Sequence, residues 1–166
     1  MRGINDSSQV WIQMWQEEQV RLGCIPYYMF MERDTGAKHY FEVPIIRAWE
    51  IYQTAIQKVS GLARTVRGPV MSALLGKVAV DGVTEIYGKK VFVLSFLQRD
   101  PNWCKRPFFA RYDEKATWLT DLVPAMGEKE FFYENKLKEI LKTQSYSRIH
   151  ESEVRNKTGF ISGFET

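Results

Sequence analysis

The 166-residue sequence has little of what marks membrane, metal-cluster or disulfide-rich proteins. Its two cysteines, Cys24 and Cys104, lie far apart, so by themselves they cannot form a disulfide framework, a cysteine-rich zinc site or an iron–sulfur cluster. The longest apolar runs, such as 91–97, are far shorter than the roughly 20 residues of a membrane-spanning helix. The N-terminus lacks the basic, apolar and small-residue order of a signal peptide. We therefore expect a cytoplasmic protein with no membrane partner.

The composition is typical of a folded globular chain. Hydrophobic residues make up 45% of the sequence and aromatic residues 14%, enough to bury the surface that offsets chain entropy. The 23 Lys and Arg residues are nearly balanced by 20 Asp and Glu residues, for a net charge of +3. This balance does not favour an extended basic face, so nucleic acid ranks last among the partner classes.

Helical and apolar patterns alternate along the first half of the chain. A helix is predicted over residues 10–22, with its apolar face at Val10, Trp11, Met14, Trp15 and Leu22. A second helix is predicted from Pro44 to Val59. The apolar run at 24–31 predicts a strand covered on both faces, with Cys24 as a buried thiol, and residues 62–66 predict the next strand. These βα units favour a parallel sheet with helices packed outside it.

The second half has a different pattern. An Asp81-Gly82 turn and the Tyr87–Lys90 segment between β-prone runs are hairpin signals. Residues 99–115 are predicted to be a loop, 130–142 a helix and 144–166 a flexible tail. Two βα units are too few to close a barrel and give a narrow open sheet, so we expect either a fragment or a partner that completes it.

Several short motifs, in order, resemble lysine 2,3-aminomutase and its relatives among the radical S-adenosylmethionine proteins. The resemblance covers about residues 2 to 80 and consists of Arg2-Gly3-Ile4-Asn5-Asp6, Ile25-Pro26-Tyr27-Tyr28, a loop to Phe41 and Pro44, and Ser60-Gly61-Leu62-Ala63. It implies an amino acid 2,3-aminomutase, an isomerase that moves an amino group between adjacent carbons. It also implies S-adenosylmethionine, a [4Fe-4S] cluster and pyridoxal phosphate as cofactors.

The resemblance further implies roles for individual residues. Lys77 falls where the family has the lysine that forms the pyridoxal Schiff base, a role that requires a nucleophilic amine. Taken as a residue alone, Lys77 fits better a solvated lysine at the start of a strand, as most lysines are, and only the resemblance brings the two interpretations level. Arg64 and Arg67 are candidate contacts for the anionic group of the cofactor, or else ordinary surface arginines.

The sequence departs from the family pattern at the substrate position. The two aspartates that hold a cationic lysine substrate align with Arg33 and Val70. Arg33 would repel an ammonium group. We therefore expect the substrate to be an acidic amino acid, whose negative charge Arg33 recognises. Asp34 lies next to it, and a loop shift by one residue would restore an acidic group.

The larger departure is at the front of the chain. The Cys-x-x-x-Cys-x-x-Cys triad of the family and the first βα units of its partial barrel are absent. We therefore expect the α/β C-terminal part of a partial (β/α) barrel over residues 1–76 and a hairpin and helix appendage over residues 77–143, inactive by itself. An N-terminal half or a second copy is the expected partner. The alternative is a non-catalytic binding module that docks on a separately encoded half.

Overall fold

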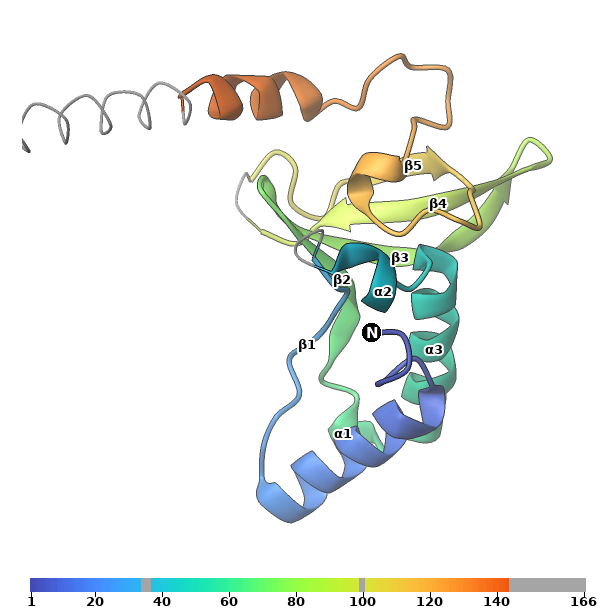
Figure 1. Ribbon diagram of the computed structural model, residues 1–166, viewed down its shortest axis with the longest axis vertical. Helices are drawn as coiled ribbons and strands as arrows, with labels where there is room; N and C mark the ends of the chain where they lie inside the picture. Colours follow the sequence, from blue (N-terminus) through green and yellow to red (C-terminus); the bar gives the residue numbers. More distant parts are fainter. Residues whose placement is uncertain (34–36, 99–100, 144–166) are drawn as a thin grey trace, which may run out of the picture. The chain divides into compact units, whose positions relative to one another are not determined.

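The computed structural model in Figure 1 describes residues 1–33, 37–98 and 101–143. These residues belong to two compact units, Met1–Lys129 and a second that begins at Glu130. The first unit confirms the predicted α/β class: its five strands form one mixed sheet in the order β1-β2-β3-β4-β5. The elements are α1 (Ser8–Leu22), β1 (Tyr28–Phe30), α2 (Lys38–Phe41), α3 (Ile45–Lys58), η1 (Gly61–Ala63), β2 (Arg67–Ala73), β3 (Gly76–Ile86), β4 (Lys89–Phe96), β5 (Pro107–Arg111) and η2 (Leu119–Asp121).

The succession β1–α3–β2 is a parallel crossover unit. β1 pairs in parallel with β2, with Tyr28 opposite Arg67 and Phe30 opposite Val70. The predicted strand at 62–66 is wrong, because η1 begins at Gly61 and β2 begins only at Arg67. Ala63 and Val66 are instead buried in the cluster formed by the helices, so their apolar character reflects helix packing and not a strand.

β1 is shorter than the apolar run that predicted it. Ile25 is 71% exposed, and Cys24 is exposed rather than a buried thiol. The run is apolar on both sides of Pro26, but only its second half meets the sheet. The prediction of a strand over 24–31 is therefore right in type and wrong in length.

The remaining strand pairs, β2–β3, β3–β4 and β4–β5, are antiparallel. Asp81-Gly82 is not a turn, since both residues lie within β3 at an irregularity in its register with β4. The turn lies at Tyr87 and Gly88, whose φ angles are 49° and 73°. β5 lies inside the segment predicted to be a loop, and its burial alternates along the strand as expected for a sheet with one covered face.

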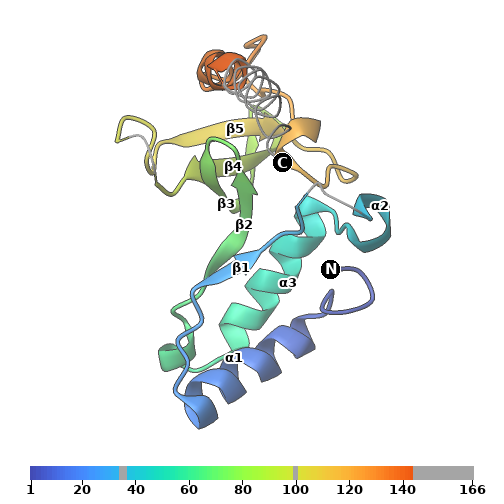
Figure 2. The ribbon, with the colours of Figure 1, turned by 60° about the vertical axis from the view of Figure 1, so that its left-hand side comes forward.

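α1 packs on α3, as Figure 2 shows, α3 packs on β2 and β3, and Met29 of β1 is buried in the same cluster. The predicted bounds of α1 and α3 agree with the structure to within two residues. Val10 and Leu22, both assigned to the apolar face of α1, are exposed. The buried cluster consists of Trp11, Ile12, Trp15, Met29, Ile51, Ala55, Val59, Ala63 and Val66.

The second unit contains a helix, residues 134–143, which the sequence predicted over 130–142. The Phe131 amide donates to the Glu134 side chain at 2.9 Å, and the Lys138 amine donates to Glu130 at 2.7 Å. The predicted flexible tail, 144–166, lies outside the described residues. Among the residues that are described, none of the helices has the length and apolar character to cross a membrane.

Candidate functional site

Lys77 lies directly after the tight connection between β2 and β3. It is the second residue of β3, opposite Ser72 in β2, and both residues line an open hollow together with Leu74 and Gln98. The Lys77 Nζ atom lies 5.4 Å from the centroid of the Tyr28 ring. This distance is within the range of a cation–π contact.

Tyr28 points away from the helices. Its neighbour Met29 is buried in the cluster formed by α1 and α3, and successive side chains of a strand point to opposite faces. The Tyr28 ring accordingly contacts the Phe30 ring, two residues on, with a centroid separation of 5.2 Å. The Lys77 amine is therefore held on the face of β1 that the helices leave uncovered.

Arg67 joins this group from β2. It is the register partner of Tyr28, and its amide donates to the Tyr27 carbonyl at 3.0 Å. A side-chain hydrogen bond with Tyr27 and, secondarily, burial raise the pKa of Tyr28, while the Arg67 guanidinium opposes this rise. We call Lys77, Tyr28 and Arg67 the Lys77 cluster.

The other two predicted site residues lie elsewhere. Arg64 ends η1 and has an exposed side chain. Arg33 is also exposed and lines a separate pocket, formed by β1, α3 and the N-terminal segment, that does not include Lys77. The structure therefore brings together two of the four predicted residues, Lys77 and Arg67, around Tyr28.

The pocket that contains Arg33 also contains carboxylates. Asp6, Glu32 and Glu42 line it, and the Glu32 Oε2 atom is buried without a hydrogen-bond partner among the described residues. The Met1 ammonium lines the same pocket, where burial lowers its pKa while the charges of Glu32 and Asp6 oppose the change. Arg33 thus lies among opposite charges and not in a purely basic environment.

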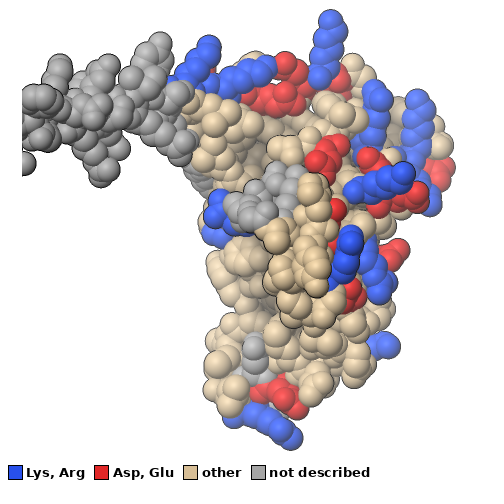
Figure 3. Space-filling view, in the orientation of Figure 1, with Lys and Arg blue, Asp and Glu red and all other residues tan. Residues whose placement is uncertain are grey.

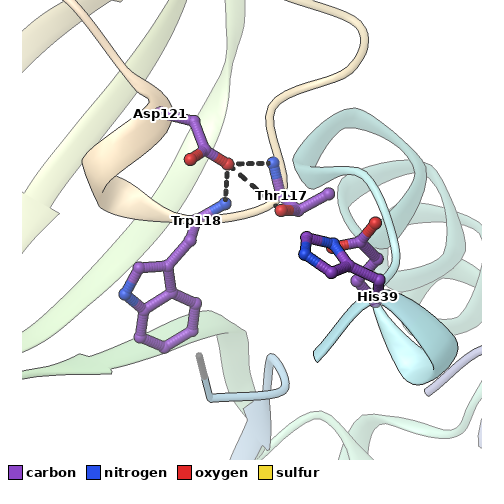
Figure 4. Close-up of polar contacts among 5 residues, drawn as sticks. His39, Thr117, Trp118 and Asp121 are labelled. Carbon is purple, nitrogen blue, oxygen red and sulfur yellow. Dashed lines mark hydrogen bonds and ion pairs between the residues drawn. The ribbon is translucent and has the colours of Figure 1, made fainter. Parts of the chain in front are cut away.

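One wall of this pocket is fixed by the turn at 117–121, shown in Figure 4. The Asp121 carboxylate accepts hydrogen bonds from the Thr117 amide at 2.9 Å, the Thr117 hydroxyl at 3.1 Å and the Trp118 amide at 3.0 Å. His39, which the sequence places in a loop, lies in α2 with its side chain 86% exposed, 3.4 Å from Glu42. A histidine with so exposed a side chain is in contact with solvent and does not line a closed site.

Charged side chains do not gather by sign on the face drawn in Figure 3, where acidic and basic residues are interspersed. Within the described segments, there is no group of three or more His, Cys, Asp or Glu side chains placed to hold a metal ion.

Sequence patterns missed Tyr28 as the partner of Lys77. Its position next to the buried Met29, on the alternate face, was the available signal.

No protein-family model matches this chain, and no solved structure matches it. A curated protein of Aquifex aeolicus (strain VF5), described as "Putative L-lysine 2,3-aminomutase", is 32% identical to it over 129 residues. The match covers 77% of this chain and 33% of the relative. The chain spans about a third of the length of the curated relative that it matches, and it is distantly related to that protein.

Proposed function

We propose that this chain is the C-terminal part of an amino acid 2,3-aminomutase-like enzyme of the radical S-adenosylmethionine type. In this proposal residues 1–76 are the last βα units of a partial barrel and residues 77–143 an appendage to it. The parallel β1–α3–β2 unit and the similarity to the Aquifex protein support the family. The observation that carries the proposal is the placement of the Lys77 amine on the sheet face away from the helices, which in a (β/α) barrel is the interior.

The residues of the Lys77 cluster fit pyridoxal phosphate. Lys77 supplies an amine at an open hollow, and the Arg67 guanidinium supplies a charge suited to a phosphate. Arg64, in the connection that leads into β2, is a further candidate for the same anion. When bound, this cofactor supplies an electron sink for chemistry at the carbons next to an amino group. The chain's own task is to hold the cofactor and orient the Lys77 amine.

Arg33 remains the residue that we propose recognises the charge of the substrate. No contact among the described residues joins it to the Lys77 cluster, and three carboxylates share its pocket. The proposal of an amino acid substrate therefore rests on Lys77 and the relative. The preference for an acidic amino acid rests on Arg33 alone, and Asp34 lies outside the described residues.

The family chemistry needs sequence beyond this chain. A [4Fe-4S] cluster of this type takes three cysteine thiolates, and the 166 residues contain two cysteines. We propose that the chain acts together with an N-terminal half, which also supplies the S-adenosylmethionine site. β1 is the end strand of the described sheet, so it is the edge on which the preceding strand of a barrel would pair.

This free edge should cause the isolated chain to self-associate as its concentration rises. Ile25→Lys, at a 71% exposed position just before β1, should weaken the association, because a lysine beside an edge strand opposes edge-to-edge pairing. Tyr87→Lys, at the exposed turn between β3 and β4, is the matched control and should leave association unchanged. Sedimentation velocity measures both. A monodisperse monomer at all concentrations would contradict the open-edge proposal.

Lys77 should be the preferred site of pyridoxal phosphate addition. The protein is incubated with a low concentration of the aldehyde, reduced with borohydride, digested and mapped by mass spectrometry. We expect the label at Lys77, its loss in Lys77→Met, and its retention in Lys89→Met, a variant of an exposed lysine at the start of β4. Labelling spread evenly over the lysines would remove Lys77 from the site and with it the main support for the proposed function.

A further inference from the structure

We propose that Tyr28 is a positioning residue for Lys77 and Arg67. Its aromatic ring orients the Lys77 amine, and its phenol hydroxyl orients the Arg67 guanidinium. This inference deepens the proposed function and rests on it. It concerns a residue that the motifs of the sequence did not mark for any role, and it follows from the contacts of β1 with β2 and β3.

The first contact is that of the ring with Lys77. A lysine side chain has several freely rotating bonds, and an exposed one occupies many rotamers. Here the Nζ atom lies over the Tyr28 ring at 5.4 Å, and the backbone of Lys77 is fixed by its pairing with Ser72. The ring therefore limits the directions that the amine takes, and the same lysine also lines the open hollow at the β2–β3 connection.

The second contact is that of the phenol with Arg67. Tyr28 and Arg67 are register partners in neighbouring parallel strands, so their side chains leave the sheet together. The Arg67 guanidinium lies close enough to the Tyr28 phenol to oppose the rise in the pKa of that phenol, and the Tyr27 and Tyr28 rings are 4.2 Å apart between centroids. Among the described residues, the charged and titratable groups that lie next to Tyr28 are thus Tyr27, Arg67 and Lys77.

The two contacts bring one amine and one guanidinium to a single ring. That ring is supported in turn by aromatic neighbours, Tyr27 at 4.2 Å and Phe30 at 5.2 Å between centroids. A ligand with an aldehyde and a separate anionic group would meet both charges in a fixed relation. Tyr28 therefore acts through Lys77 and Arg67, without itself taking part in the covalent step.

Two substitutions separate the two contacts. Tyr28→Leu removes the ring and the phenol, whereas Tyr28→Phe keeps the ring and removes only the phenol hydroxyl. Tyr40→Leu, which alters an exposed tyrosine of α2, is the control for loss of a surface ring. Circular dichroism and the midpoint of thermal unfolding establish that each variant is folded.

The first readout needs no cofactor. In the nuclear magnetic resonance spectrum, the ε-methylene protons of Lys77 should show a ring-current shift in the wild type and in Tyr28→Phe, and should lose it in Tyr28→Leu. A wild-type spectrum without this shift overturns the inference. If Tyr28→Leu does not fold, the spectra of the wild type and of Tyr28→Phe still test the contact, because both proteins keep the ring and both should show the shift.

The second readout is labelling with two aldehydes, pyridoxal phosphate and pyridoxal, each followed by borohydride reduction. The amine condenses with the aldehyde with loss of water, and borohydride supplies the hydride that makes the bond permanent. Tyr28→Leu should reduce labelling of Lys77 by both aldehydes about two- to fivefold, the factor expected for an exposed cation–π contact. Tyr28→Phe should keep pyridoxal labelling and lose part of the preference for the phosphorylated aldehyde.

The outcomes distinguish the inference from the proposed function. If Lys77 is labelled equally in the wild type and in Tyr28→Leu, the positioning role is overturned and the proposed function stands. If wild-type Lys77 is not preferentially labelled while the ring-current shift is present, the cofactor role of Lys77 is overturned. The contact between Tyr28 and Lys77 would then be a structural feature of the sheet only.

Discussion

Replacing Trp15 with alanine should lower the free energy of unfolding by about 3–5 kcal/mol, the usual cost of truncating a fully buried tryptophan. Trp15 is 1% exposed and lies between the two long helices of the first unit. Its ring contacts Trp11 in α1 at 5.5 Å and Tyr52 in α3 at 6.1 Å between centroids. Alanine would leave a cavity at the contact that holds α1 on α3.

The control for Trp15→Ala is Leu22→Ala in the same helix. Leu22 is 72% exposed, so this substitution should change the free energy of unfolding by less than about 0.5 kcal/mol. Urea unfolding followed by tryptophan fluorescence and circular dichroism measures both variants. Equal effects of the two substitutions would show that α1 is not packed as described.

Gly68→Ala should destabilise the protein by about 3 kcal/mol or more, because it combines overpacking with an unfavourable backbone conformation. A Cβ atom at this position would lie 2.8 Å from the Met29 carbonyl oxygen and 2.9 Å from the Met29 Cβ atom. The φ angle of Gly68 is +152°, which side chains rarely adopt. β1 and β2 would have to separate to admit the methyl group.

Gly61→Ala provides the comparison for Gly68→Ala. Gly61 begins η1, and a Cβ atom there would meet nothing within 4 Å. We expect Gly61→Ala to be near neutral in urea unfolding and in the labelling of Lys77. Gly68→Ala should weaken both, since Tyr28 reaches Lys77 only when β1 lies against β2. A stable Gly68→Ala protein with unchanged labelling would contradict this close approach.

The two long helices, α1 and α3, could be predicted from the sequence because each has apolar residues at helical spacing and recognisable ends. α3 follows Pro44, and Gly23 follows α1 with a φ of +66°. The predicted strand at 62–66 failed because Ala63 and Val66 are apolar for a tertiary reason, packing under α1 and α3. The prediction of a turn at Asp81-Gly82 was wrong because the same two residues are typical of a turn and of an irregularity within a strand. Only the pairing with the neighbouring strand distinguishes these two structures.

The site was predictable only in part. The resemblance placed Lys77 and Arg67 in one site, and the structure brings both to Tyr28. The resemblance also placed Arg33 there, but the chain direction after β1 takes Arg33 to another pocket. Contacts between strands that are far apart in the sequence, such as Lys77 with Tyr28, depend on register, which no local pattern of residues fixes here.

The three-residue length of β1 has a consequence for how the site opens. Local unfolding begins where a segment has few backbone hydrogen bonds, and β1 pairs with one neighbour over three residues while β3 and β4 pair along most of their length. Transient detachment of β1 would carry the Tyr28 ring away and leave Lys77 on the more persistent β2–β3 hairpin. Lys77 therefore lies in a hairpin that resists local unfolding, whereas Tyr28 lies in a strand that unfolds more readily. A further strand paired with β1 would add backbone hydrogen bonds and make β1 harder to detach.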